Sequence, residues 1–208
     1  GISPEDWAGE PAALAAGIAA HVAAQKAAGR TVVVYAGSHG EPNALDVLLD
    51  AAAALRHEAF AFVLVGDGHE KARLAQRVTA ESLAQVRLFE PVPKAQIRAL
   101  LALADIAYIG WKRQPLYRFG ISPNKLMDYM MAGVPVLHSV EAGNDPVAEA
   151  GCGLTVAPES ADAVVQGLRA LAATPLAERR AMGARGHEFV LAHHSYPVLA
   201  QRFIEAVS

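Results

Sequence analysis

The sequence has a single cysteine and no long apolar run. Because Cys152 has no partner within the chain, an intrachain disulfide and a cysteine-rich metal site are both excluded, and a reducing, cytoplasmic setting is favoured. No run of about 18 apolar residues that could cross a membrane occurs, and the first residues lack the basic and apolar regions of a signal peptide. We therefore expect a soluble, cytoplasmic chain.

Excess positive charge and phosphate-loop motifs are absent as well. A net charge of −3 over 208 residues argues against a nucleic-acid-binding protein, because such domains are usually strongly basic. Neither G-x-G-x-x-G nor G-x-x-x-x-G-K-[ST] occurs, so the dinucleotide fingerprint and the P-loop are both missing. Apolar side chains are abundant at 53%, which suffices for the core of one large domain.

Short β-rich runs alternate with helical segments along most of the chain. This alternation predicts right-handed βαβ units, and hence a single domain (1–208) of the α/β class with a Rossmann-like, doubly wound parallel sheet of about six strands and helices on both faces. Strands are expected at 31–36, 60–65, 86–89, 106–109, 134–137 and 153–156. Helices are expected at 11–28, 43–55, 70–79, 93–103, 161–172, 176–192 and 197–207, whereas 1–10 is expected to have neither.

The stretch 115–136 concentrates more chemistry than any other part of the sequence. Ser122 is a good N-cap and Pro123 suits the first position of a short helix, so Lys125 falls in its first turn. A helix dipole favours an acid at that place and not a lysine. The placement indicates a bound anion, held jointly by free backbone N–H groups and the ammonium, with the amide of Asn124 close by.

Asp128 follows Lys125 by three residues and shares its helix face. Two interpretations stay open: the residues form a plain intrahelical ion pair, or Asp128 accepts hydrogen bonds from sugar hydroxyls while Lys125 holds a neighbouring phosphate. The loop before the helix is rich in bases, with Lys112, Arg113 and Arg118 and no acid, so it is either a solvated surface or a site that attracts phosphate.

The Gly37-Ser-His-Gly40 turn after the first strand is also ambiguous. It either only redirects the chain or brings backbone N–H groups to a phosphate. His39 is the one histidine of interest, because the adjacent His193 and His194 do not share a helix face, and a metal site has little support. Cys152 is expected to be a small buried residue and not a nucleophile.

Five stretches together resemble a known family: GSHGEPNALDVLLDAAAAL, FVLVGDGHEKARL, VRLFEPVPKAQIRALLALADIAYI, NDPVAEAGCGLTVAPES and, most specifically, PLYRFGISPNKLMDYMMAGVPVL. Nearly the whole chain resembles the C-terminal, donor-binding domain of GT-B fold glycosyltransferases of the retaining family 4. It is most similar to the subgroup that transfers N-acetylated aminosugars in bacterial surface-polysaccharide assembly. The opening GISPEDW resembles the end of an interdomain linker, so 1–10 is expected to be a linker remnant.

The resemblance implies a role for each matching residue in binding a nucleotide-diphosphate sugar, with UDP as the expected nucleotide. Lys125 and Arg118 would be catalytic, because both would stabilise the leaving phosphate. The implied donor-binding residues are Gly37, Ser38 and His39 beside the diphosphate, Ser122, Asn124 and Leu126 at the helix start, Asp128 on the ribose, Tyr117 and Phe119 at the sugar, and Phe89, Glu90 and Pro91 at the nucleobase.

One departure limits these assignments. The family's usual two glutamates stand eight positions apart, and counting back eight positions from Asp128 reaches Gly120, so no sugar-contacting acid can be assigned. The resemblance further implies that no metal cofactor is needed, since cationic groups take its place. It also implies an N-terminal acceptor-binding domain that this chain does not contain, and therefore a fragment inactive alone. Peripheral membrane association of the full-length enzyme, at the inner face of the membrane, is compatible with it.

Two other functions compete with this interpretation. A non-catalytic nucleotide-binding module would keep the fold without the sugar-side residues. Half of a non-hydrolysing nucleotide-sugar epimerase would share the two-domain architecture and would isomerise a sugar nucleotide without an acceptor.

Overall fold

All six expected strands join one parallel sheet in the computed structural model, which describes residues 1–207. The sheet order is β3-β2-β1-β4-β5-β6, and every neighbouring pair is parallel. The strands are β1 (Thr31–Ala36), β2 (Phe60–Val65), β3 (Val86–Phe89), β4 (Ile106–Gly110), β5 (Val136–Ser139) and β6 (Gly153–Thr155). The predicted α/β, Rossmann-like class is confirmed.

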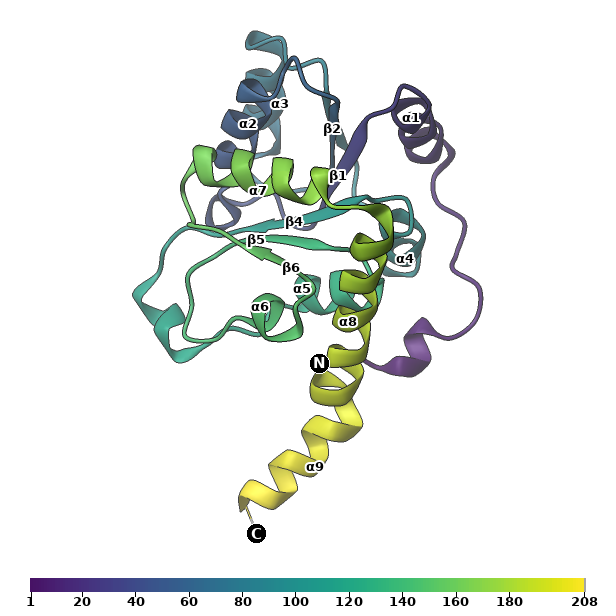
Figure 1. Cartoon of the computed structure of the whole chain (residues 1–208), viewed down its shortest axis with the longest axis vertical. Helices are drawn as coiled ribbons and strands as arrows, with labels where there is room; N and C mark the ends of the chain where they lie inside the picture. The colour runs from purple at the N-terminus through teal and green to yellow at the C-terminus, as the bar shows by residue number, and fades with distance from the viewer. Residues whose placement is uncertain (208) are drawn as a thin grey trace.

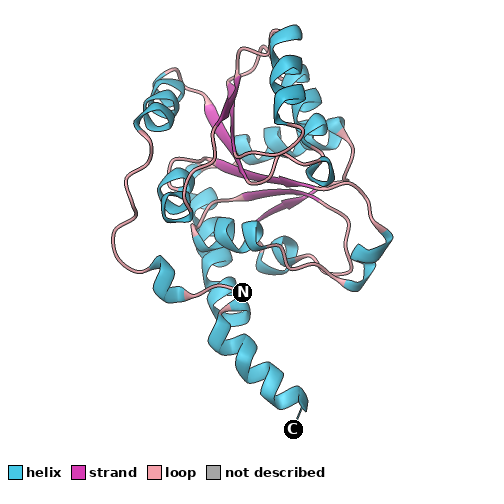
Figure 2. Cartoon of the chain, turned by 180° about the vertical axis from the view of Figure 1, so that it is seen from behind, coloured by secondary structure: helices cyan, strands magenta, loops and turns pink. Residues whose placement is uncertain are grey.

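Helices cover both faces of this sheet (Figures 1 and 2). One face packs against α2 (Leu45–Ala54), α3 (Lys71–Ala80) and α7 (Ala161–Ala173). The other packs against α1 (Ala16–Ala27), α4 (Lys94–Leu101), α5 (Asn124–Met131), α6 (Pro146–Ala150) and α8 (Leu176–His194). Helix α9 (Tyr196–Val207) extends away from the sheet, and single turns of 3₁₀ helix stand at η1 (Pro4–Trp7), η2 (Glu41–Asn43) and η3 (Pro115–Phe119).

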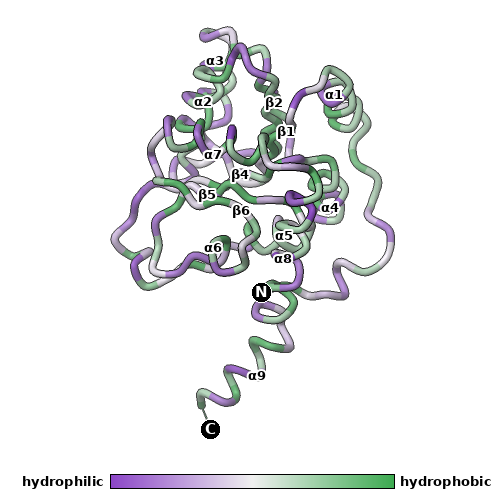
Figure 3. The backbone as a smooth tube through the Cα atoms, viewed as in Figure 1, coloured by the Kyte–Doolittle hydropathy of each residue, from purple (hydrophilic) through white to green (hydrophobic). Residues whose placement is uncertain are grey.

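The central strands are apolar at nearly every position, as parallel strands covered on both faces require. Every residue of β2 and of β4 is buried. Figure 3 shows the hydrophobic colour following the strands in the middle of the molecule. Alternate residues of a strand therefore pack into two hydrophobic cores, one on each face of the sheet. Val34 of β1 belongs to one core and Tyr35 to the other.

The N-terminal segment differs from the prediction. Residues 1–10 were expected to have neither helix nor strand, but they contain η1, and Ile2 is buried and pairs with Ser195 at the end of α8. Helix α1 begins at Ala16 and not at Pro11, because the chain before it is held against α4, where the Arg98 side chain donates to the carbonyl oxygens of Trp7 and Gly9.

Strand β5 begins two residues later than predicted. Pro135 has no N–H to donate to a ladder, and Val134 donates instead to the Tyr129 carbonyl at the end of α5. Paired strand starts at Val136. Helix α6 was not predicted; Asp145 caps it by accepting a hydrogen bond from the N–H of Ala148.

The order of the strands reverses between β1 and β4, so the chain leaves these two strands in opposite directions. Ladder pairing between them ends at Val34 and Ala107, and beyond that point the strands diverge. The buried Tyr129 of α5 fills the gap, since its hydroxyl accepts from the Ala36 N–H at 2.8 Å and lies 3.2 Å from the Ala36 carbonyl oxygen. A crevice at such a switch point is the usual ligand site of open α/β sheets.

We predict that Tyr129→Phe lowers the free energy of unfolding by about 1–3 kcal/mol, because it leaves the buried Ala36 N–H without a partner. Urea unfolding followed by circular dichroism measures the change. Tyr196→Phe is the matched control, since the Tyr196 side chain is 57% exposed and its hydroxyl bonds nothing within residues 1–207. Equal midpoints for the two variants would contradict the bridging role of Tyr129.

Candidate functional site

The candidate site lies at the carboxyl ends of β1 and β4, where the strand order reverses. The loop after β1 contributes Gly37 and Ser38, and the chain after β4 runs through η3 into the N-terminus of α5. Helix α5 packs its buried face, which includes Leu126 and Met127, against the core below the sheet edge. Its first turn is thereby held at the crevice.

The start of α5 lies one residue away from the predicted place. Pro123, and not Ser122, occupies the N-cap position of the helix. No side chain there accepts a hydrogen bond from a backbone N–H of the first turn. The N–H groups of Leu126 and Met127 bond the Pro123 carbonyl. Those of Asn124 and Lys125 have no partner within residues 1–207, so two donors remain available at the positive end of the dipole.

The Lys125 side chain reaches from this turn back to β1. Its Nζ donates to the hydroxyl of Tyr35 at 2.8 Å and to Oδ1 of Asn43 at 2.6 Å, and it lies 4.5 Å from the centre of the Tyr35 ring. The Tyr35 hydroxyl in turn donates a hydrogen bond to the Ser38 carbonyl oxygen at 2.6 Å. All of these partners are neutral.

Lys125 is therefore a half-buried cation without a counter-ion. No carboxylate pairs with it within residues 1–207, and burial lowers the pKa of its ammonium to about 7. An ammonium has three N–H donors, and the contacts with Tyr35 and Asn43 use two. The third donor, together with the free N–H groups of the first turn, suits an anion.

Gly37 leaves room for this arrangement. A Cβ atom at Gly37 would lie 3.0 Å from both Cε and Nζ of Lys125 and 3.2 Å from the Tyr35 hydroxyl. A side chain at this position would crowd the ammonium, which would have to shift by a few tenths of an ångström. Gly37 thus lies beside Lys125, as the resemblance implied for two residues of one phosphate site, whereas the exposed Ser38 contributes its carbonyl to Tyr35.

Asp128, three residues after Lys125, faces the N-terminal segment and α4, whereas Lys125 reaches β1. It forms no ion pair with Lys125, so the plain intrahelical pair is ruled out. Its carboxylate lies with Trp7 and Lys94 in a cavity between the N-terminal segment and α4. Burial raises the pKa of this carboxyl, and the positive charge of Lys94 opposes that rise. Asn124 shares a second, smaller cavity with Asp128.

The loop 111–121 is fastened at its base and exposed at its tip. Ile121 exchanges two hydrogen bonds with the Asn144 side chain, at 2.7 and 3.0 Å, and Gly120 has a φ of 102°, which favours glycine. Tyr117 packs its ring on Trp111 at 5.0 Å between centroids.

At the tip of this loop, Arg118 stacks on the 75% exposed ring of Phe119 at 4.7 Å and has no carboxylate partner within residues 1–207. Arg118 lines a cavity with Arg113 and Glu141, and Lys125 is not part of that cavity.

Of the remaining predicted residues, His39 and Leu126 are buried, whereas Glu90 and Pro91 are exposed. His39 is fully buried, neither ring nitrogen has a partner within residues 1–207, and its pKa is lowered to about 4 by burial and by the nearby Lys71. Phe89 packs edge-on against the His21 ring. Glu90 pairs with Lys71 at 2.8 Å, Pro91 is exposed, and Leu126 is buried.

Residues 30–174 match the family model described as glycosyl transferases group 1. The chain belongs to this family. It is 29% identical over 144 residues to a putative colanic acid biosynthesis glycosyl transferase of Escherichia coli K12; the match covers 67% of this chain and 35% of that protein. The chain therefore spans about a third of the length of its curated relative.

Solved structures show the same fold. The Anabaena protein HepE, solved in complex with UDP-glucose, superposes with a TM-score of 0.76 at 16% identity, over 100% of this chain and 55% of that one. The C-terminal domain of a group 1 glycosyl transferase from Francisella tularensis gives a TM-score of 0.68 at 14% identity, over 94% of this chain and 100% of that one. The architecture is that of GT-B glycosyltransferases.

Several residues of this glycosyl transferase chain that shape the site were not predicted from the sequence. Tyr35 and Asn43 hold the ammonium, Tyr129 anchors the helix, and Trp7 covers Asp128. Tyr35 could have been found, because a tyrosine that faces inward near the end of a buried strand needs a polar partner for its hydroxyl. Nothing local to Asn43 or Trp7 gave such a signal.

Three further observations concern the described residues 1–207 alone. No group of three or more His, Cys, Asp and Glu side chains is arranged to hold a metal ion. Metal independence of the reaction stays a prediction. No helix in this range combines the length and the apolar character needed to cross a bilayer. Cys152 is buried, and burial raises the pKa of its thiol to about 12, which suits a structural residue.

We predict that the Lys125 amine titrates with a midpoint near pH 7, because burial lowers its pKa, whereas the hydrogen bond to Glu41 raises the pKa of the Lys112 amine above its ordinary value. Reductive ¹³C-methylation and NMR titration measure both, with Lys125→Met assigning the signal. Since the folded pKa of Lys125 lies below its unfolded value, the unfolded chain binds more protons at this group, and the free energy of unfolding should increase as pH rises from about 7 to 10. Lys125→Met should remove that increase. A Lys125 midpoint above pH 9 would contradict the effect of burial.

Proposed function

We propose that this chain is the nucleotide-sugar-binding half of a retaining glycosyltransferase, of the family 4 type, that uses a UDP-N-acetylaminosugar in polysaccharide or glycolipid assembly. The observation that carries the proposal is the uncompensated Lys125 ammonium at the switch point, next to the free N–H groups of α5 and the close approach of Gly37. Membership in the glycosyl transferase family supports a sugar-transfer reaction.

The names of similar proteins support the finer points. The relative from E. coli is named for colanic acid biosynthesis, which supports a polysaccharide product. The HepE structures contain UDP or UDP-glucose, which supports a uridine nucleotide. The length of the relative supports a second, acceptor-binding domain in the complete enzyme, and the solved Francisella domain supports a C-terminal position for this half.

In this proposal the bond between the anomeric carbon and the diphosphate oxygen breaks, and a bond to an acceptor oxygen forms. Negative charge develops on the leaving diphosphate. Lys125 and the N–H groups of Asn124 and Lys125 would stabilise that charge from fixed positions, so little reorganisation is needed during the reaction. Arg118 would supply a second positive charge from the neighbouring loop, and these cationic groups would replace a metal ion. The acceptor hydroxyl loses its proton to a group outside this chain, so the fragment alone would bind donor without turnover.

We predict that isothermal titration calorimetry of this chain shows binding of UDP and UDP-N-acetylglucosamine, with weaker heats for GDP and ADP. Lys125→Met, which keeps the aliphatic stem, should weaken UDP binding by at least tenfold, because a charge-assisted contact to phosphate is lost. Lys112→Met is the matched control, since Lys112 is exposed and paired with Glu41 at 2.6 Å; its affinity should stay within twofold of the original chain.

Two results of the same titrations would contradict the proposal. One is absence of heat with every nucleotide from a folded chain. The other is UDP affinity unchanged in Lys125→Met, which would favour a nucleotide-binding module without a catalytic lysine. Isomerisation of the sugar nucleotide by the full-length protein without an acceptor would favour an epimerase instead.

A further inference from the structure

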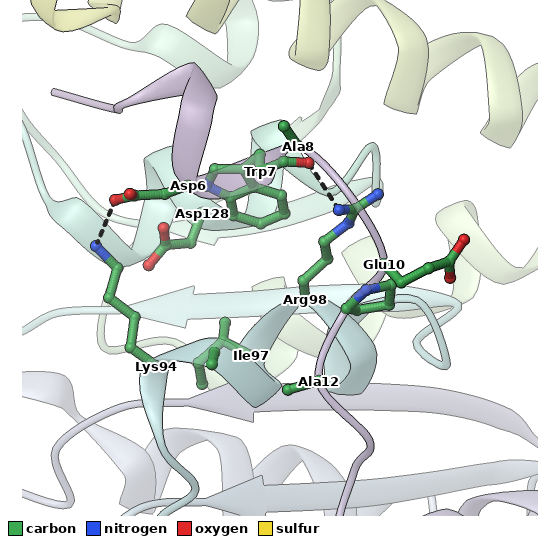
Figure 4. A pocket seen from close by; sticks show the side chains of 11 residues that line it. Asp6, Trp7, Ala8, Glu10, Ala12, Lys94, Ile97, Arg98 and Asp128 are labelled. Atoms are coloured by element: carbon green, nitrogen blue, oxygen red, sulfur yellow. Dashed lines mark hydrogen bonds and ion pairs between the residues drawn. The ribbon is translucent and has the colours of Figure 1, made fainter.

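A cavity of about 470 Å³ lies between the N-terminal segment and α4, and it is lined by Asp128 of α5 and not by Lys125. Its volume is in the range of small-molecule sites. Figure 4 shows the Asp128 carboxylate beside the Trp7 ring and Arg98 reaching up to the backbone of the segment. The lining residues that matter here are Trp7, Ala12, Lys94, Ile97, Arg98 and Asp128.

The N-terminal segment that lines one side of this cavity is held in place by hydrogen bonds. Nη1 of Arg98 donates to the carbonyl oxygens of Trp7 and Gly9 at 2.7 and 2.5 Å, and Asp6 lies 3.9 Å from the Lys94 ammonium. At the start of the chain, Ile2 bonds the backbone of His194 and Tyr196 at 2.9 and 2.8 Å. The segment is thus tied at two places, before and after Trp7.

The chemistry of the lining suits a molecule that joins a planar ring to a group carrying hydroxyls. Trp7 presents an indole face, Ile97 and Ala12 add apolar contacts, and the Asp128 carboxylate makes no hydrogen bond or ion pair within residues 1–207. A half-buried carboxylate without donors gains from hydrogen bonds to hydroxyls. Stacking of a base on an aromatic side chain adds affinity without needing sequence-specific polar contacts.

A second cavity of about 250 Å³ joins this space to the start of α5. It shares Trp7, Lys94 and Asp128 with the first cavity and adds Asn124. Lys125 lies in the same helical turn but faces β1. A ligand with its ring against Trp7 and its phosphates at the first turn would therefore pass around the helix start, with its ribose at Asp128.

Two of the three residues that the family resemblance implied for the nucleobase, Phe89 and Glu90, make other contacts, whereas Pro91 is exposed. The Phe89 ring packs against His21 at 5.4 Å and against the Arg87 guanidinium at 5.9 Å, and the Glu90 carboxylate is paired with Lys71. Neither Phe89 nor Glu90 lines the cavity beside Asp128.

We infer that Trp7 and the segment around it form the nucleoside pocket of the donor site, in which the nucleobase stacks on the Trp7 indole while the ribose hydroxyls bond Asp128. The inference rests on the proposed function and deepens it, because it makes the N-terminal segment part of the specificity for the nucleotide. Lys94 and Arg98 act as positioning residues that hold the segment in place.

Tryptophan fluorescence tests this directly, since Trp7 and Trp111 are the chain's two tryptophans. In a Trp111→Phe background, UDP and millimolar uridine should quench or shift the Trp7 emission, whereas pyrophosphate should bind calorimetrically and leave the emission unchanged. Trp7→Ala should weaken UDP binding by about tenfold and change pyrophosphate affinity by less than twofold. Trp7→Phe, which keeps an aromatic face, should restore most of the UDP affinity.

The outcomes separate the two proposals. A folded chain that binds neither UDP nor pyrophosphate overturns the proposed function. UDP binding that leaves the Trp7 emission unchanged, with equal UDP affinity in Trp7→Ala, overturns the nucleoside pocket alone. If Trp7→Ala does not fold, judged by its thermal transition, the emission change in the Trp111→Phe background still decides the matter, because Trp7 is intact there.

Discussion

The attachment of α5 to the end of β1 is the constraint on which the candidate site depends. Tyr129 and Lys125 stand four residues apart and share a helix face, and both reach the last residues of β1. Tyr129 does so inside the core, where its hydroxyl takes the ladder position that the diverging β4 leaves open. The ammonium of Lys125 is consequently set by the packing of the core and not by a flexible loop.

Helix α5 divides the site into two chemically different sides. The side toward β1 carries an uncompensated cation and the close approach of Gly37, which suits phosphate. The side toward α4 carries a carboxylate and an indole, which suits hydroxyls and a ring. The ligand proposed above, a sugar nucleotide, combines these groups in one molecule, and the free N–H groups at the helix start lie between the two sides.

The sequence predicted the sheet well because buried parallel strands leave a strong local signal. The runs 31–36, 60–65 and 86–89 are strands with the expected bounds, whereas β5 was misplaced because Pro135 shifts the start of pairing. Lys125 could be predicted at the start of a helix from its neighbours. Its partners Tyr35 and Asn43, and the direction of Asp128, could not, because they depend on contacts between segments more than 80 residues apart.

The contacts of α1 and α8 show how far this folding unit extends beyond the stretch that matches the family. The family match covers 30–174, yet Val22 of α1 and Val190 of α8 are completely buried in the core that contains α5. Gly183 of α8 touches the backbone of Gly133 where α5 ends. A polypeptide trimmed to the homologous stretch would expose apolar surface beneath the very helix that bears Lys125. The cooperative folding unit is therefore wider than residues 30–174, which match the family model.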